Sequence, residues 1–395
     1  MQPQLISHSP DLKKLSEEGY QLEIDGGFLL VHHIPYLNAS KEIKYGIIIC
    51  TLNLVNPNLA GTPPDHTAYF KGETPYYSSG QPLSAIINNS ATQQLSPNII
   101  VNHFFSSKPK SGKYLDYYEK IRTYAEILSS QAQVLDSTVT SKPGKTTQIV
   151  ERQSVFQYPD TNSVKAKINN LNEKFNGLKI AIIGLGGTGS YILDLIAKTP
   201  VQEIHLYDND NFELNNAFRA PGATAGDKFG ELTELKKVDY YAEIYSRMHK
   251  GIRPHTTFVT EEIIIAFSQY DFVFICIDSN AFRTMIIRNL VKFNISFIDV
   301  GLGVNFADDS LIGTLRVTSG SGLKSDHLEN RIGQVDQEEN EYATNIQIAD
   351  LNCLNAVLAV IKWKKKIGFY QDLKKENNSF YFINTNKLLN EDFTA

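Results

Sequence analysis

The first residues whose types and spacing could do chemistry form a run of glycines after a short apolar segment. Residues 179–183 (KIAII) lead directly into Gly184, Gly186, Gly187 and Gly189, and the helix-like segment SYILDLIAKT follows. Glycines permit a tight turn and close backbone approach, and a helix start offers free N–H groups to a phosphate. The run predicts a nucleotide site, although glycines alone are also compatible with a purely structural turn.

Two carboxylates follow on the next apolar segment, EIHLYDND. Asp208 ends that segment about 20 residues after the glycines, where a carboxylate can accept hydrogen bonds from ribose hydroxyls. Asp210 lies two residues further on. Up to this point the pattern fits a dinucleotide-binding oxidoreductase equally well, since Gly184, Gly186 and Gly189 satisfy the spacing G-x-G-x-x-G.

Further motifs resemble one superfamily. The form Gly-x-Gly-Gly-x-Gly, the acidic pair in YDND, and Asn216-x-x-Arg219 in LNNAFRA resemble the ATP-binding run of the ThiF/MoeB and ubiquitin-activating enzymes. The segment KVDYYAEIYSRMH, which begins at Lys237, and the element Asp278-x-x-x-x-Arg283 are similar to two later motifs of that superfamily. The likeness covers about residues 179–300 and implies a Rossmann-like α/β domain that adenylates a carboxylate with ATP and Mg²⁺.

The resemblance assigns roles to these side chains. Attack of a carboxylate on the α-phosphate of ATP builds negative charge that fixed cations must offset, and Arg219 and Lys237 are suitable cations. By resemblance, Asp208 holds the ribose, Asn216 contacts the phosphates, and Asp278 is the Mg²⁺ ligand. Arg219, Lys237 and Asp278 form the implied catalytic set. The implied ATP-binding set is Gly184, Gly186, Gly187, Gly189, Asp208, Asp210, Asn216, Arg219, Lys237 and Arg152.

Several of these residues have a second interpretation. Asp278 could cap a helix that starts near Asn280, because aspartate is a favoured cap. Lys236 could replace Lys237 as the phosphate ligand. Arg219 could be an ordinary loop arginine, and Arg283 could pair with a helix neighbour, so it is left outside the chemistry.

Arg152 enters through a proposed dimer. Members of the superfamily carry an Arg-Gln pair upstream of the glycines and use that arginine on the ATP of a partner subunit, and Arg152-Gln153 is a similar pair. Its separation from Gly184 is longer than usual by roughly two helical turns. The resemblance therefore predicts a homodimer, and a solvated arginine at a domain edge is the alternative.

The chain departs from the superfamily in its cysteines. Relatives often hold zinc with two Cys-x-x-Cys pairs, but the corresponding residues 313–345 contain no cysteine, so we expect no zinc. Cys50, Cys276 and Cys353 lie in apolar surroundings and are expected to be buried and inert, so the sequence offers no obvious thioester cysteine. Hydroxyls of residues 318–325, in an expected flexible loop, are a weaker candidate for an acyl acceptor.

The elements that must position these residues fall into two domains. Residues 1–136 contain strand-like segments followed by a helix-like segment, KYLDYYEKIRTYAEILSSQAQVLD, and predict an α+β module. Residues 137–150 are polar with a Pro-Gly step and predict a linker. Residues 151–395 alternate strand-like and helix-like segments, which predicts a mostly parallel sheet with helices on both faces.

The first module is the less informative part of the chain. Its expected sheet and following helix are loosely similar to a ubiquitin-conjugating fold, which would suit partner recruitment, but no active-site cysteine follows. Asp65, His66 and Glu73 lie near one another, and without a second ligand cluster they are assigned no metal site.

Composition restricts the partners. The chain has 38 basic and 43 acidic residues, and no long basic run argues for nucleic acid. No apolar stretch reaches membrane-spanning length, and sparse cysteines favour the cytoplasm. We therefore expect adenylation of the C-terminal glycine of a ubiquitin-like protein, with a possible conjugating-enzyme partner. The alternatives are adenylation of a small molecule, peptide or tRNA base, an NAD-dependent oxidoreductase, and an inactive scaffold.

Overall fold

The computed structural model describes residues 2–144, 154–226, 235–332 and 346–394. The chain forms two compact units, Met1–Glu173 and Lys174–Ala395. The units divide after Glu173, whereas the sequence places the boundary within residues 137–150. Part of that linker lies outside the described residues, so the linker stays a prediction.

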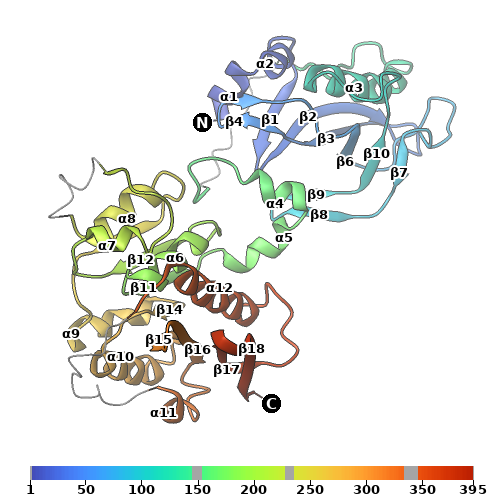
Figure 1. Ribbon diagram of the computed structural model, residues 1–395. Helices are drawn as coiled ribbons and strands as arrows, with labels where there is room; N and C mark the ends of the chain where they lie inside the picture. The colour runs from blue at the N-terminus through green and yellow to red at the C-terminus, as the bar shows by residue number, and fades with distance from the viewer. Residues whose placement is uncertain (1, 145–153, 227–234, 333–345, 395) are drawn as a thin grey trace. The chain divides into compact units, whose positions relative to one another are not determined.

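The first unit is an antiparallel sheet with its three longest helices on one face (Figure 1). Its six strands are ordered β1-β2-β3-β6-β10-β7. These strands are β1 (Gln21–Asp25), β2 (Phe28–Leu37), β3 (Ile43–Thr51), β6 (Thr67–Lys71), β10 (His103–Ser106) and β7 (Ile87–Asn89). Two small hairpins pair β4 (Leu54–Asn56) with β5 (Leu59–Ala60) and β8 (Gln93–Ser96) with β9 (Ile99–Val101).

The expected helix of this module is α3 (Tyr117–Gln133). It begins there because the Asp116 side chain accepts a hydrogen bond from the backbone N–H of Glu119. Its apolar face packs Ile121 and Leu128 into the main core, together with α1 (Gln2–His8) and α2 (Pro10–Glu17), which the sequence does not predict. The short helices α4 (Thr161–Ala166) and α5 (Asn169–Asn172) belong to the first unit by contact, since Val164 packs in its second core.

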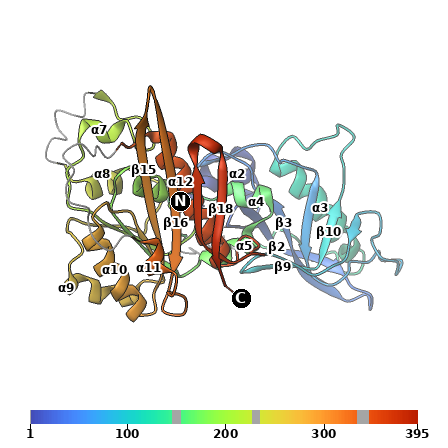
Figure 2. The same cartoon turned by 60° about the horizontal axis from the view of Figure 1, so that its bottom comes forward.

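The second unit is built on an eight-stranded sheet ordered β13-β12-β11-β14-β15-β16-β17-β18. The strands from β13 to β15 are parallel and the last three pairs are antiparallel. These strands are β11 (Lys179–Ile183), β12 (Glu203–Tyr207), β13 (Ile252–His255), β14 (Phe272–Ile275), β15 (Ser296–Ala307), β16 (Ser310–Gly320), β17 (Glu376–Phe382) and β18 (Lys387–Phe393). Figure 2 shows β15 beside β16, with β18 at the edge of the sheet; β17 lies between β16 and β18.

Helices cover both faces of this sheet, as the alternating pattern predicts. One core packs α6 (Gly187–Ile196), α8 (Lys237–Tyr245) and α12 (Ala349–Lys366) against it, and the opposite core packs α9 (Glu261–Ile264), α10 (Asn280–Lys292) and α11 (Leu328–Arg331). The short α7 (Leu214–Ala217) follows β12. The predicted fold class, a Rossmann-like α/β domain preceded by an α+β domain, is confirmed.

No helix in the described ranges is both long enough and apolar enough to cross a membrane.

Candidate active site

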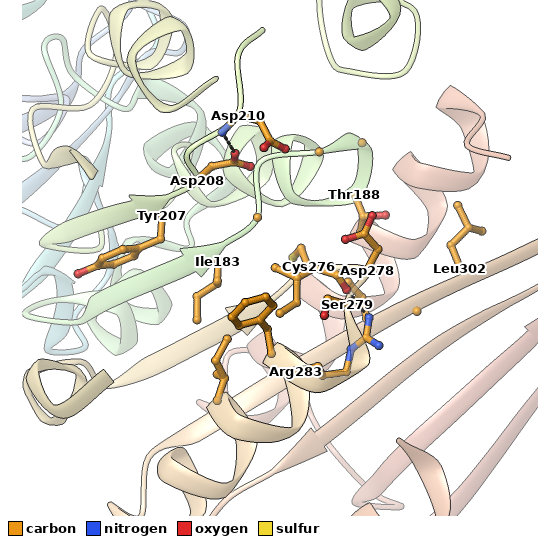
Figure 3. Close-up of a pocket in the computed structure, with 18 of the residues that line it drawn as sticks. Ile183, Thr188, Tyr207, Asp208, Asp210, Cys276, Asp278, Ser279, Arg283 and Leu302 are labelled. Carbon is orange, nitrogen blue, oxygen red and sulfur yellow. Dashed lines mark hydrogen bonds between the residues drawn. The ribbon is translucent and has the colours of Figure 1, made fainter. Parts of the chain in front are cut away.

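A cavity of about 640 Å³ opens where the parallel strands change direction of winding. The first strand of the domain, β11, lies between β12 and β14, so the connections leave it to opposite sides and a crevice forms at the carboxyl ends of β11 and β14. In Figure 3, Asp208 and Asp210 lie at one end of this pocket and Leu302 at the other. Ligands of open α/β sheets bind at this position.

The glycines are required by close contacts as well as by the turn. Gly184 has φ +90°, and a Cβ there would lie 2.6 Å from the carbonyl oxygen of Cys276. A Cβ at Gly187 would collide with the amide of Asn352, and one at Gly189 with the carbonyl of Gly184. A Cβ at Gly186 would meet nothing within 4 Å, so the start of α6 faces open space that a phosphate can occupy. Gly184, Gly186 and Gly187 line the cavity; Gly189 does not and instead packs the loop.

Asp208 is buried beside the glycine loop. Its carboxylate accepts a hydrogen bond from the backbone N–H of Leu185 at 2.7 Å. It also accepts one from the backbone N–H of Asp210 at 2.8 Å, which Figure 3 draws. Burial raises the pKa of Asp208, and the charge of Lys237 and these two N–H groups oppose the rise. Each oxygen keeps a free acceptor direction, so hydroxyl donors of a ligand would stabilise the ionised form.

Lys237 is the first residue of α8 and lines the cavity. Its Nζ contacts Asp210 Oδ2 at 2.7 Å, so the acidic pair and the cation form one electrostatic group. Lys236 instead donates from Nζ to the carbonyl of Asn209 at 2.6 Å and is not among the lining residues. The structure therefore favours Lys237 over Lys236 as the cation that reaches a ligand.

Arg219 follows α7 and also lines the cavity. Its Nε is buried and has no hydrogen-bond partner within the described part of the chain. A buried guanidinium donor without a partner is costly, and an anionic ligand would satisfy it. Asn216 does not line the cavity, because its Oδ1 accepts the backbone N–H of Glu213 at 2.8 Å and caps α7.

Asp278 lies between the end of β14 and the start of α10. Ser279, not Asp278, is the N-cap residue of α10, so the alternative interpretation as a helix cap is not what the structure shows. The carboxylate of Asp278 is exposed in the cavity and has no hydrogen-bond or ion-pair partner among residues that the structure describes. Figure 3 shows it on the side of Thr188. Its position leaves the oxygens available to a cation.

A buried ion triad under the cavity was missed at the sequence level. Arg283 Nε contacts Asp299 Oδ1 at 3.0 Å, and Arg316 Nη2 contacts Asp299 Oδ2 at 2.5 Å. Asp299 is fully buried, and both arginines line the cavity. Asp299 ends the apolar segment SFID, which is the one signal that could have indicated a functional carboxylate there.

Two asparagines of α12 also line the cavity and were not predicted. Asn352 accepts from the Thr188 hydroxyl at 3.2 Å and donates to the carbonyl of Arg219 at 3.3 Å, so it ties the glycine loop to the arginine loop. Asn355 donates to the carbonyl of Gly301 at 3.1 Å. Their spacing of three residues within the mainly apolar stretch LNCLNAVLAVI of α12 is a signal that polar side chains share one face.

The nucleophile candidates change with the structure. Cys50 is buried as expected, but Cys276 and Cys353 are only partly buried, so the expectation of burial was wrong for these two. Burial raises the pKa of the thiols of Cys50 and Cys276, which keeps both protonated. Thr318 and Ser319 are fully buried in β16 rather than exposed in a flexible loop, so they are excluded as acyl acceptors.

Two further candidates from the sequence are Arg152 and the group Asp65, His66 and Glu73. Arg152 lies outside the described residues, so its role stays a prediction. In the first unit, Asp65 Oδ1 accepts from Thr67 and pairs with Lys120, while Glu73 accepts from Asn38. Within the described ranges no group of three or more His, Cys, Asp or Glu side chains is placed to hold a metal ion.

Comparison with known families supports the nucleotide-binding interpretation of the second unit. Residues 161–307 match the model of the ThiF family, and residues 10–161 match a domain of unknown function, DUF6791. The second part of this chain is therefore a ThiF family domain, which confirms the predicted resemblance, and the N-terminal domain is unassigned.

The relatives found are distant. The chain is 25% identical over 162 residues to the tRNA threonylcarbamoyladenosine dehydratase of Haemophilus influenzae, covering 35% of this chain and 59% of that protein. The chain thus spans less than two thirds of this curated relative. Similar solved structures are E. coli MccB (TM-score 0.46, 16% identity, 59% of this chain and 67% of that chain) and PaaA (TM-score 0.43, 16% identity, 56% and 75%).

Proposed function

We propose that the second unit adenylates a carboxylate with ATP. The observation that carries the proposal is the gathering of Lys237, Arg219 and Asp278 around one glycine-lined cavity. Among the residues that the structure describes, the Nε of Arg219 and the carboxylate of Asp278 have no partner. A nicotinamide dinucleotide needs neither a cluster of cations nor a free carboxylate at the phosphates, whereas a triphosphate that loses pyrophosphate needs both. The ThiF family match supports the same class of reaction.

The side chains suit the charge changes of the reaction. A carboxylate oxygen attacks the α-phosphorus, the bond from that phosphorus to the bridging oxygen breaks, and pyrophosphate leaves with the electron pair. We assign Arg219 and Lys237 to the phosphates, where they offset the developing charge, and Asp208 to the ribose hydroxyls. Asn216 acts on the phosphates only indirectly in this arrangement, because it caps the helix that precedes Arg219.

The donor set fits Mg²⁺. This ion is commonly held by one or two carboxylates together with substrate phosphates rather than by an all-protein cage, and Asp278 supplies one unpaired carboxylate. Bound Mg²⁺ would neutralise phosphate charge. Asp278 would hold that ion at the end of β14, on the side of Thr188.

The substrate we favour is the C-terminal glycine of a ubiquitin-like protein, activated by a homodimer and passed to a partner protein. A peptide or a modified tRNA base is the alternative, and the similarity to a protein named tRNA threonylcarbamoyladenosine dehydratase supports it. The tRNA alternative predicts a basic flank, and 38 basic against 43 acidic residues do not favour one.

Paired variants test the site. Arg219→Ala should weaken Mg·ATP binding by roughly tenfold or more, because it removes a charged donor to phosphate. Asp278→Asn should weaken binding in Mg²⁺ but leave binding in EDTA unchanged, which separates a metal ligand from a structural residue. Calorimetry with and without Mg²⁺ measures both. Equal loss in the two conditions for Asp278→Asn would contradict the metal assignment.

The dimer is tested by complementation. Mixing Arg152→Ala with Asp278→Asn protein should restore part of the pyrophosphate exchange if Arg152 acts across a two-fold interface, because mixed dimers hold one intact site. Lack of recovery despite subunit exchange would show that Arg152 acts within its own chain or has no catalytic role.

A further inference from the structure

The first unit brings an exposed serine to a buried histidine at the edge of its six-stranded sheet. The edge strand β7 ends at Asn89, which pairs with Phe104 of β10, so the next residue of each strand, Ser90 and His103, lie beside each other. Ser90 Oγ is 2.9 Å from Nδ1 of His103. Ser90 is exposed, whereas His103 is 5% exposed. A hydroxyl that solvent can reach is thus in contact with an imidazole that is shielded from solvent.

The surroundings of His103 favour a neutral ring whose Nδ1 is an acceptor. Burial beside Phe70 and Phe105 lowers the pKa of His103, and a hydrogen bond to the backbone of Gly72 opposes this shift. A hydrogen bond that raises the pKa of a histidine is donated by the ring, so a backbone carbonyl accepts the ring N–H there. A neutral imidazole has one N–H and one acceptor nitrogen. Nδ1 therefore accepts the hydroxyl hydrogen of Ser90, which is the geometry of a nucleophile beside its general base.

The same unit contains a second serine–histidine pair that lacks these features. Ser106 Oγ is 3.2 Å from Nε2 of His66, and both residues are partly exposed. The contact is longer than the one at Ser90, and the imidazole is less shielded from solvent. Ser106 is therefore an internal comparison for Ser90.

An adenylated acyl group that is passed on needs a nucleophile to receive it. The thiols of Cys50 and Cys276 stay protonated because burial raises their pKa. Thr318 and Ser319 are fully buried in β16. An exposed hydroxyl whose hydrogen is bonded to a neutral histidine can serve instead, because the base removes the proton as the oxygen attacks.

We propose that Ser90 accepts the acyl group of an acyl adenylate, with His103 as its general base. Ser90 Oγ attacks the acyl carbon while its proton passes to Nδ1 of His103. The bond from the acyl carbon to the phosphate oxygen breaks, AMP leaves with the electron pair, and an ester remains on Ser90; His103 later loses the proton to water. The inference rests on the proposed adenylation, because that reaction makes the acyl adenylate.

The probe is synthetic acetyl adenylate, which carries the same mixed anhydride and needs no ATP. The full chain is mixed with the probe, samples are stopped in acid over time, and acetylated serines are located by peptide mass spectrometry. Ser90 should be acetylated at least tenfold faster than Ser106, because it has the shorter contact to the more buried imidazole.

Variants assign the reactivity to the pair. Ser90→Ala should remove the label, and the fold should tolerate this change because Ser90 is exposed. His103→Gln should slow the acetylation of Ser90 about 100-fold, which is within the usual contribution of a general base. Ser106→Ala is the matched control and should leave the rate at Ser90 unchanged. Thermal unfolding checks that each variant is folded.

The outcomes separate this inference from the proposed function. Acetylation of Ser90 no faster than that of Ser106, or an unchanged rate at Ser90 in folded His103→Gln, overturns the inference. If His103→Gln does not fold, the comparison of Ser90 with Ser106 in the wild-type protein still decides. Because the probe bypasses ATP, rapid acetylation of Ser90 in a chain that does not bind Mg·ATP would overturn the proposed adenylation alone.

Discussion

Each unit of the chain contains a buried lysine beside an aspartate, and the two pairs differ in what surrounds them. In the first unit, Lys120 is fully buried and donates to the carbonyl of Asp65 at 3.0 Å and to its carboxylate at 3.2 Å. In the second unit, Lys237 pairs with Asp210 at 2.7 Å, and both residues line the cavity. A lysine–aspartate pair thus lies at the edge of the core in the first unit and lines a ligand-sized cavity in the second.

The pKa of an aspartate is shifted in opposite directions in the two surroundings. Burial raises the pKa of Asp65, but Lys120 and hydrogen bonds from Thr67 outweigh it, and the pKa is lowered overall. For Asp208, which neighbours the second pair, burial dominates and the pKa is raised. For Asp65, the charge of Lys120 and the hydrogen bonds outweigh the cost of burying the carboxylate. For Asp208 they do not, so further hydrogen-bond donors from a ligand would stabilise its ionised form. A buried charged group therefore indicates a ligand site when the protein's own charges and hydrogen bonds do not offset the cost of its burial.

The largest effect that this comparison predicts is at Lys237. Lys237→Met should weaken Mg·ATP binding about 100-fold, because it removes a desolvated cation next to the phosphates. Calorimetric titration measures the loss, and thermal unfolding checks that the fold survives. If affinity falls less than twofold, Lys237 serves only to neutralise Asp210 and resembles Lys120.

A smaller and different effect is expected at Lys120. Lys120→Met should lower the free energy of unfolding by about 2 kcal/mol, because it leaves the carboxylate of Asp65 without its partner; this is less than for a fully buried pair, since that carboxylate is partly exposed. Mg·ATP affinity should stay at the wild-type value. Urea unfolding and calorimetry on the same sample measure both. Loss of ATP binding without loss of stability would reverse the roles given to the two lysines.

The smallest predicted effect concerns pH. Burial lowers the pKa of His249 from 6.5 to about 4, so the folded protein binds fewer protons than the unfolded chain and stability falls as pH falls through this window. Between pH 7 and 5.5 this histidine should account for about 1 kcal/mol. His249→Asn should flatten the dependence of urea midpoints on pH by that amount. An unchanged slope would show that other buried groups dominate.

The sequence predicts the phosphate end of the site better than the substrate end. Glycines followed by Asp208, and Lys237 at a helix start, are recognisable because each must occupy a fixed place along one strand–turn–helix path. Asp299, Arg316 and Asn355 come from three elements, and their meeting depends on the pairing of β15 with β16 and the packing of α12. The spacing of residues along the sequence cannot show that side chains from three separate elements lie close together.

Element prediction failed in the same way. The helix α3 and the parallel strands β11, β12, β14 and β15 are recognisable in the sequence, whereas the parallel strand β13 was not predicted. The strands β17 and β18 were not predicted either, because ENNSFYF and KLLNEDF show no alternation that separates them from loops. The family resemblance implies that Asn216 contacts the phosphates, whereas in the structure its side chain caps α7. Asparagine can either cap a helix or bind a phosphate, and which of the two it does depends on its neighbours in the folded structure.

The most direct test of the account is a calorimetric comparison of Mg·ATP and NAD binding to the wild-type chain. The cation Lys237, together with an Arg219 Nε and an Asp278 carboxylate that have no partner in the described ranges, predicts micromolar binding of Mg·ATP and at most weak binding of NAD. The Arg219→Ala variant provides the matched control and should lose most of the ATP signal. Micromolar binding of NAD with no binding of ATP would contradict adenylation and place the glycine loop in an oxidoreductase.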